Sequence, residues 1–292
     1  MDHNQEASTI PRTRAASSGE SQFKSLSLGK ALELLRCFTK EQPEWSLADL
    51  SRAQDLPKAS VLRLARTLEE YGFLARDSSG RYRLGFELVR LSQILLDSLN
   101  VKGLAARPMR RLVERFRETT YLSLRQGWNV ICIERLDSPE PLHVVADLGT
   151  GAPLGVGSWG KSILAFMADE DIEAVIAAAQ KGLLPAGLAD GEALRAALAE
   201  VRSRGYANTT GERLAGITGV TSPIFNARGE PIGAIGLSFP NQRFDRARIG
   251  DYASTLCAEC REVSRAMGFT NWPVDGPPQT RSPAPVLTAR ST

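Results

Sequence analysis

The sequence predicts an α+β protein whose two halves are built differently. Residues 26–84 hold three helical patterns followed by the pattern of a hairpin. From about residue 101 onward, strand and helix patterns alternate and the chain closes with a hairpin and a helix, which favours an antiparallel sheet covered by helices. We therefore expect a helix-turn-helix domain with a two-stranded wing, followed by an α+β domain.

The first half begins with an amphipathic helix over 28–38, in which apolar residues recur every three or four positions. Ser46 lies three residues before Asp49, which is the spacing of a helix start that is capped by its own side chains. Pro57 favours the start of a third helix, because the N–H that proline lacks has no partner in a first turn. Gly72 is expected to end that helix, since glycine readily adopts the left-handed conformation found there.

Two short strands are predicted at 73–76 and 81–84, on either side of a turn at 77–80 that contains Asp, Ser and Gly. A further amphipathic helix is predicted at 86–99, and it is unusually rich in Leu, Ile and Val. A helix this apolar between two domains needs a surface to cover it, so we expect a second copy of the chain to do so.

The second half is predicted to contain helices and strands in mixed order. The predicted helices cover 104–118, 158–168, 169–180, 190–204 and 244–267. The predicted strands cover 120–126, 129–136, 142–146, 217–226 and 231–239. The expected division of the chain is an unstructured tail over 1–23, a winged helix-turn-helix domain over 24–85, a linker helix over 86–100, an α+β domain over 101–268 and a proline-rich unstructured tail over 269–292.

Positive charge is concentrated in the first half. The stretch from Lys58 to Arg90 holds seven Lys or Arg and four Asp or Glu, so its net charge of +3 equals that of the whole 292-residue chain. The four cysteines do not make a disulfide framework in a chain of this length. The polar N-terminus lacks a secretory signal and no apolar run is long enough to cross a membrane, so a cytoplasmic protein is expected.

The helix that begins at Pro57 separates its apolar side chains from its basic ones. Val61, Leu62, Ala65 and Leu68 are expected to pack on the domain, which leaves the other face free to enter a major groove. Arginine there can read guanine through paired hydrogen bonds, and wing arginines suit phosphate or minor-groove contacts. The candidate DNA-contacting residues are Lys58, Ser60, Arg63, Arg66, Thr67, Arg76, Arg81 and Arg83. A solvated helix face and a charged hairpin edge that prevents aggregation are the alternatives.

Catalytic, metal and cofactor sites are not predicted. Ser158 lies in Gly-Ser-Trp-Gly, which lacks the glycine spacing of a nucleophile elbow. Cys257 and Cys260 have no second pair of ligands at zinc-site spacing, and His143 lies in a strand pattern without a neighbouring nucleophile. The glycines between 149 and 160 match neither a P-loop nor a dinucleotide fingerprint.

Two separate blocks of sequence resemble transcriptional regulators of the IclR family. The resemblance covers roughly 25–268 and is carried by SLGKALELL at 27–35, PKASVLRLARTLEEYG at 57–72, YRLG at 82–85, WGKSILAF at 159–166, GVTSPIF at 219–225 and GAIGLS at 233–238. It implies a DNA-binding domain, a linker helix and an effector-binding domain with a GAF-like sheet. It also implies homodimers or homotetramers that bind double-stranded operator DNA.

The resemblance further implies an effector pocket between the helix that starts near 158 and the last strands. Carried over by position, the lining residues are Leu154, Ser158, Trp159, Ile217, Gly219, Gly236 and Ser238. A helix N-terminus is a natural place for a carboxylate, because its free N–H groups carry partial positive charge. Trp159 departs from the small residue that is frequent there in the family, so it is expected either to shrink the pocket or to stack on an aromatic effector.

These observations predict a DNA-binding transcriptional regulator that senses a small organic or aromatic acid and needs no cofactor. Two other functions stay open from the sequence. The second half could be an enzyme fused to a DNA-binding domain, which a turnover assay on candidate metabolites would reveal. The winged helix could instead contact protein or RNA, which strong sequence preference for duplex DNA would exclude.

Overall fold

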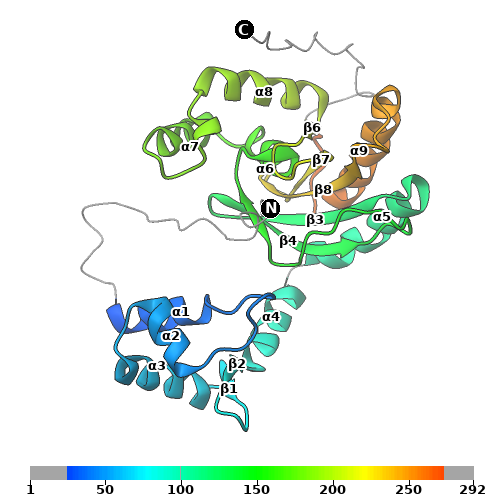
Figure 1. The fold of residues 1–292 in the computed structure, drawn as a ribbon. Coiled ribbons are helices and arrows are strands. Elements are labelled where there is room, and N and C mark those ends of the chain that lie inside the picture. The colour runs from blue at the N-terminus through cyan, green and yellow to red at the C-terminus, as the bar shows by residue number, and fades with distance from the viewer. Residues whose placement is uncertain (1–24, 99, 273–292) are drawn as a thin grey trace. The chain divides into compact units, whose positions relative to one another are not determined.

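The computed structural model describes residues 25–98 and 100–272. The chain divides into two compact units between Asn100 and Val101 (Figure 1). The first unit contains three helices, a hairpin and a further helix, and the second contains a six-stranded sheet with helices on both faces. The α+β class and the winged helix-turn-helix in front of an antiparallel sheet domain are thereby confirmed.

The first unit follows the predicted order of elements. Its helices are α1 (Leu26–Leu35), α2 (Leu47–Gln54), α3 (Lys58–Glu70) and α4 (Glu87–Ser98), and its hairpin pairs β1 (Leu74–Arg76) with β2 (Tyr82–Leu84). Ser46 caps α2, where its Oγ accepts a hydrogen bond from the Asp49 N–H at 3.2 Å. Asp55 and Gly72 adopt positive φ angles at the ends of α2 and α3, so the chain turns sharply after each helix.

One small core holds the three helices and the wing together. Its fully buried members are Leu34, Leu50, Val61, Ala65, Leu74 and Tyr82. Leu64 packs against this core, whereas Leu62, which was expected on the inner face, is only partly buried and lies outside it. The reason is the helical period, because Leu64 lies three residues after Val61 and therefore on the same face.

The second unit is built on one antiparallel sheet in the order β5-β4-β3-β8-β7-β6. The strands are β3 (Thr119–Gln126), β4 (Asn129–Leu136), β5 (Gly151–Pro153), β6 (Ala207–Thr210), β7 (Ile217–Phe225) and β8 (Pro231–Pro240). The helices are α5 (Asn100–Phe116), α6 (Gly157–Leu164), α7 (Asp169–Gln180), α8 (Gly191–Arg204) and α9 (Ile249–Ala266), with short 3-10 turns at Ala186–Leu188 and Arg246–Arg248.

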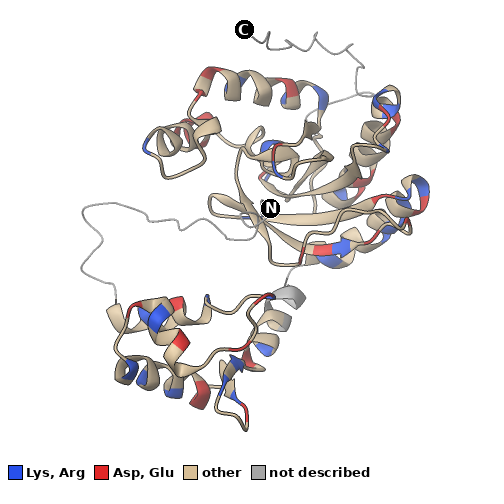
Figure 2. Cartoon of the chain, in the orientation of Figure 1, with Lys and Arg blue, Asp and Glu red and all other residues tan. Residues whose placement is uncertain are grey.

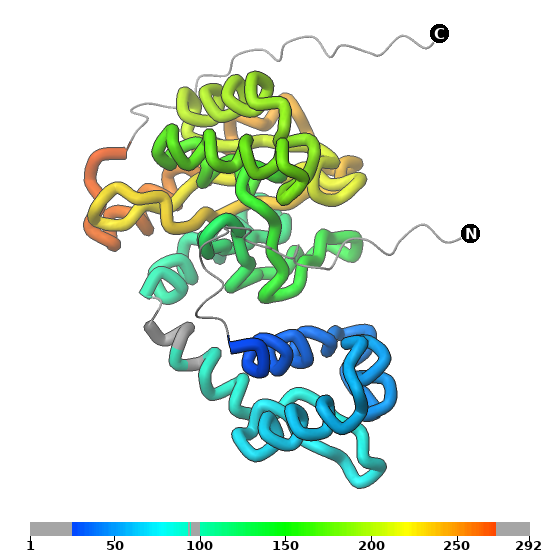
Figure 3. The backbone as a smooth tube through the Cα atoms, turned by 90° about the vertical axis from the view of Figure 1, so that its left-hand side faces the viewer, coloured from blue at the N-terminus to red at the C-terminus, as the bar shows by residue number. Residues whose placement is uncertain are grey.

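Alternation along β8 assigns the helices to the two faces of the sheet. Phe239 packs on Tyr252 of α9, with ring centroids 4.7 Å apart, and Tyr252 also contacts Phe116 of α5. Ala234 faces the opposite way, into the core that the sheet shares with α6, α7 and α8. Ser238 lies on the same side as Ala234, because side chains two residues apart along a strand share a face. Figures 1 and 3 show α7 and α8 side by side beyond α6.

Three local predictions for the second unit were wrong. Residues 142–146 form no strand, because the Tyr121 hydroxyl takes the place of a neighbouring strand: it donates to the Val144 carbonyl and accepts from the Ala146 N–H, each at 2.9 Å. Strands β5 and β6 were not expected, since three or four residues show no period. Tail residues 269–272 are ordered instead, as Phe269 and Trp272 pack on Phe225. The other predicted tail residues lie outside the described ranges.

Two glycines let α6 approach the sheet closely. A Cβ atom added to Gly219 of β7 would lie 2.3 Å from the Ser158 Oγ, and one added to Gly236 of β8 would lie 2.6 Å from the Thr221 Oγ1. Thr221 in turn donates a hydrogen bond to the Ser158 Oγ at 2.9 Å. The glycines are therefore needed for packing around Ser158. Within the described ranges, every helix is too short or too polar to cross a membrane.

Replacing Gly236 by Ala should lower the free energy of unfolding by about 1–3 kcal/mol, because the added methyl group overlaps Thr221. The matched control is Gly103→Ala in α5, where an added Cβ meets no atom within 4 Å and should stabilise the helix by up to about 1 kcal/mol. Urea unfolding of the three proteins measures both effects. Equal stability of the parent protein and Gly236→Ala would show that this contact relaxes freely.

Candidate nucleic-acid interface and ligand pocket

The outer face of α3 carries exposed cations. Val61 and Ala65 are fully buried beneath the helix, while Lys58, Arg63 and Arg66 are exposed. Figure 2 shows Lys and Arg in blue along α3, with more blue on the hairpin that follows. The helix thus presents its charge to solvent, as the sequence predicted.

The three cations on α3 are not engaged by any residue that the structure describes. Lys58, Arg63 and Arg66 make no side-chain hydrogen bond or ion pair with any residue of the described ranges. Ser60 is partly buried, and the Thr67 hydroxyl donates to the carbonyl oxygen of Arg63 at 3.1 Å. The three cations therefore stay available to an external anion, whereas the hydroxyl of Thr67 already has an internal partner.

The three wing arginines differ in how free they are. The Arg76 Nε donates to the Gly80 carbonyl at 3.1 Å, so this side chain braces the turn. Arg81 donates to the Glu44 carbonyl at 3.1 Å, and its Nε lies 3.5 Å from the Glu44 carboxylate. Arg83 is exposed and makes no such contact in the part of the chain that the structure describes. Arg83 is thus the most available cation of the wing.

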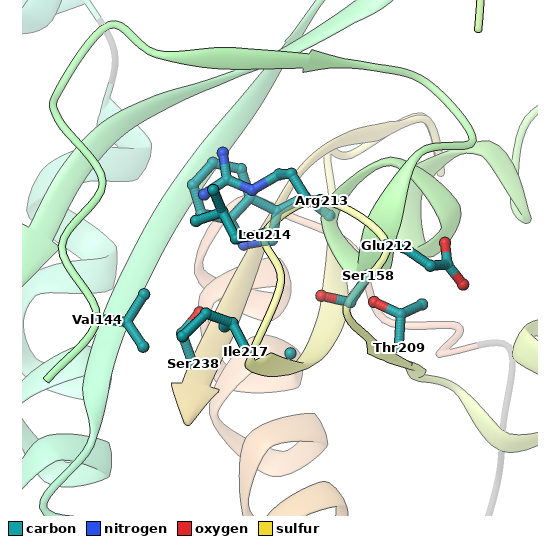
Figure 4. A pocket seen from close by; sticks show the side chains of 10 residues that line it. Val144, Ser158, Thr209, Glu212, Arg213, Leu214, Ile217 and Ser238 are labelled. Carbon is teal, nitrogen blue, oxygen red and sulfur yellow. The ribbon is translucent and has the colours of Figure 1, made fainter. Parts of the chain in front are cut away.

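The second unit contains a small pocket of about 30 Å³ beside the start of α6 (Figure 4). It is lined by α6, by the facing side of the sheet, by Val144 and by the loop 211–216. Figure 4 shows Ser158 and Thr209 close together on one side and Val144 on the other. The lining residues are Val144, Ser158, Trp159, Thr209, Glu212, Arg213, Leu214, Ile217, Gly219 and Ser238.

The structure brings five of the seven predicted pocket residues together: Ser158, Trp159, Ile217, Gly219 and Ser238. Leu154 does not line the pocket, because it is fully buried in the core beneath α6. Gly236 does not line it either, and its lack of a side chain serves the close contact with Thr221 instead. A glycine that is needed for packing cannot be told from a glycine beside a ligand by its position in the sequence alone.

Arg213 is the main pocket residue that the sequence did not single out. Its guanidinium carbon lies 4.1 Å from the centre of the Trp159 ring, which is the geometry of a cation–π contact. Burial lowers the pKa of Arg213 below its usual value, although the group stays charged. The indole of Trp159 therefore stacks on the protein's own guanidinium, and the pocket is small in this form.

The neighbouring Glu212 makes a different set of contacts. Its carboxylate accepts a hydrogen bond from the Gly157 N–H at 3.2 Å and pairs with the Lys161 ammonium at 2.7 and 2.8 Å. The N-terminus of α6, where the sequence predicted a carboxylate from an effector, thus already binds a carboxylate of the protein. Gly211 and Gly216 at the ends of this loop have positive φ angles, and they were the available signal that the chain turns sharply here.

The residues considered for catalysis or metal binding make ordinary structural contacts. Cys257 and Cys260 are buried against β7, and burial raises the pKa of Cys257 to about 11, so its thiol is unreactive at neutral pH. The Nδ1 of His143 lies 2.8 Å from the Glu140 carbonyl. Within the described ranges, His, Cys, Asp and Glu form no group of three that could hold a metal ion.

A winged helix with free cations on its third helix, in a chain whose second unit carries a small polar pocket, defines the class of DNA-binding regulators with a sensor domain. Comparison with known families shows which family of this class the chain matches. Residues 27–78 match the IclR helix-turn-helix domain and residues 93–265 match the C-terminal domain of bacterial IclR transcriptional regulators. The chain belongs to the IclR family.

Relatives along most of the chain agree with this assignment. The transcriptional regulator XynR of Escherichia coli is 28% identical over 83% of this chain and 97% of its own length. The crystal structure of Thermotoga maritima IclR is 26% identical, with a TM-score of 0.66 over 83% of this chain and 99% of that one. The crystal structure of an IclR homologue from Microbacterium hydrocarbonoxydans, complexed with 4-hydroxybenzoate, is 26% identical. It has a TM-score of 0.69 and covers 82% of this chain and 99% of that one.

Family membership settles the general function. The protein is an IclR-type transcriptional regulator that binds DNA through its helix-turn-helix domain and has a C-terminal effector-binding domain. It is a regulator and not an enzyme.

Replacing Glu212 by Gln should loosen the loop 211–216, because it removes the ion pair with Lys161 and weakens the bond to Gly157. Limited trypsin digestion followed by mass spectrometry should then show faster cleavage after Arg213, by about fivefold, since a contact of this kind contributes about 1 kcal/mol. The control is Glu173→Gln, which removes an exposed ion pair with Arg195 and leaves the loop untouched. Equal cleavage in all three proteins would show that Glu212 does not hold the loop.

Proposed function

We propose that the protein binds operator DNA with α3 in the major groove and the wing on the backbone, and that a small organic acid in the pocket beside α6 controls this binding. The observation that carries the proposal is the set of free cations on α3, above the buried Val61 and Ala65. A solvated helix face would gain from pairing its cations with nearby acids, whereas a DNA-reading face needs them unpaired.

The roles of the individual residues follow from their exposure and partners. Arg63 and Arg66 lie along the exposed face of α3 and suit base edges, while Lys58 at its start suits a phosphate. Arg83 is the wing residue best able to contact the backbone. Arg76 and Arg81, which are engaged with Gly80 and Glu44, act mainly by shaping the wing.

An organic acid as the effector is supported by the positive charge in the pocket and by the relative that binds 4-hydroxybenzoate. The pocket beside α6 offers one guanidinium, several hydroxyl groups and an apolar wall. A small acid with an apolar body matches that combination.

Self-association is supported by apolar side chains at the start of α4 and along it. Phe86, Val89 and Ile94 are 84%, 61% and 55% exposed. Exposed apolar residues at this density favour an interface with a second copy, which would place two α3 helices on successive half-sites of an operator about 34 Å apart.

Mapping the genomic DNA that the purified full chain binds, at physiological salt, tests the proposal. Specific fragments should be bound at least about 1000-fold more tightly than random duplex. Adding the acids made or consumed by the neighbouring gene products should change that affinity. A chain that binds no fragment above random duplex, with or without such acids, would contradict the proposed function.

Replacing Arg63 by Ala should relax sequence preference at one position of the half-site, with a loss of about 1–3 kcal/mol of discrimination. Competition with a set of single-base operator variants measures it. The control is Arg228→Ala, which removes an exposed arginine from the second unit. An unchanged base preference in Arg63→Ala would exclude Arg63 from base reading.

Replacing Arg83 by Ala should weaken binding to all sequences alike and reduce the slope of log K against log salt by about 1, as expected for one lost phosphate contact. Arg81→Ala is the matched comparison, just before β2 in the same wing, and its change in slope should be smaller because Arg81 is already engaged with Glu44. Titration of labelled operator across a range of salt concentrations gives both slopes. A larger change in Arg81→Ala would reverse these assignments.

A further inference from the structure

The guanidinium of Arg213 is a positive charge without a counter-ion in the pocket. It makes no hydrogen bond or ion pair with any residue of the described ranges, and its one contact of note is the face of Trp159. The adjacent carboxylate of Glu212 is already paired with Lys161. Arg213 is partly buried, so its charge loses part of its hydration without gaining an anionic partner.

The two ionisable groups that act on Arg213 from the sheet, Tyr121 and Cys132, are neutral. Burial raises the pKa of Tyr121 to about 12 and that of Cys132 to about 11, so neither supplies a negative charge at neutral pH. The Tyr121 hydroxyl is also fully engaged with Val144 and Ala146. Glu212 is the one carboxylate among the lining residues, and it is paired with Lys161 rather than with Arg213.

Further unused hydrogen-bonding groups line the same pocket. Trp159 is 3% exposed, and its indole N–H has no hydrogen-bond partner among the described residues. The same holds for the hydroxyl groups of Thr209 and Ser238. These three groups border the cavity and are not shut off from water, so water can pair them in the empty pocket and a ligand can take its place.

We propose that Arg213 binds the carboxylate of the effector and thereby restricts the effector to small monocarboxylic acids with an apolar body. This inference rests on the proposed function of the pocket and goes beyond it by naming the selecting residue. A single guanidinium matches one carboxylate in charge and geometry, whereas a phosphate dianion would need a second cation. The ammonium group of Lys161 in α6 is held by Glu212.

The other wall of the pocket and the loop fix the rest of the ligand. Val144, Leu214 and Ile217 are apolar and would contact its body. The present volume of about 30 Å³ holds little more than water, so binding needs the loop 211–216 to move outward. Gly211 and Gly216 flank this loop, and glycine is the residue that changes its backbone angles most freely.

The first experiment requires no ligand. Replacing Arg213 by Met removes an unpaired charge and keeps much of the side-chain volume, so Arg213→Met should raise the Tm of the ligand-free full chain by about 2–4 °C. The control Arg228→Met, at an exposed arginine in a turn, should leave Tm unchanged. A lower Tm in Arg213→Met would show that Arg213 has a structural role and would overturn the proposal.

The second experiment uses matched acids and amides as probes: benzoate and benzamide, phenylacetate and phenylacetamide, pyruvate and pyruvamide. At least one acid should bind the parent protein by calorimetry while its amide does not, and Arg213→Met should bind that acid about 30-fold or more weakly. Arg213→Lys should restore part of the affinity. Binding of amides as tightly as acids, equal binding by Arg213→Met, or failure of every acid would overturn the proposal.

Failure of this inference and failure of the proposed function are separable. A parent protein that binds specific genomic fragments but prefers amides would refute the role of Arg213 alone. A parent protein that binds no specific fragment would refute the proposed function, whatever the calorimetry shows.

Discussion

The close approach of α6 to the sheet is the constraint on which the pocket depends. Only glycine at position 219 leaves room for the Ser158 hydroxyl, and Gly236 leaves room for Thr221, which donates a hydrogen bond to that same hydroxyl. This contact fixes the start of α6 against β7 and β8. Trp159 in α6 and Ser238 in β8 then face the same cavity. The position of each residue in its helix or strand sets the direction of its side chain, and the packing fixes the two elements against each other.

The loop 211–216 borders this cavity and carries two opposite charges, Glu212 and Arg213, which have different neighbours. Glu212 pairs with Lys161 and caps α6, which stabilises the closed loop. Arg213 has no counter-ion among the described residues, so its charge is left for a ligand to pair. An anion that pairs with Arg213 would shift the position of the loop by as much as its affinities for the closed and open loop differ.

The sequence predicted what periodicity and local capping determine. Ser46, Gly72 and the apolar rows of the helices placed most elements, because each signal acts within a few residues. It did not predict that the Tyr121 hydroxyl binds residues 142–146, or that Arg213 reaches Trp159, since both contacts join segments more than 20 residues apart. Gly236 resembled a ligand-binding residue by position, and only the distance to Thr221 shows that it serves packing.

Both sites present cations that have no anionic partner among the described residues, one set at the surface and the other in the pocket. On α3, Lys58, Arg63 and Arg66 are exposed and unpaired, which costs little because water solvates them, and this suits a polyanion bound at the surface. In the pocket, Arg213 is unpaired and largely shielded, which costs more and suits one small anion that excludes water when it binds. Low polarity around Arg213 strengthens its attraction to an anion. The same low polarity makes the charge costly when no anion is bound. A shielded cation therefore favours tight binding of a small anion. Exposed cations favour reversible binding of DNA.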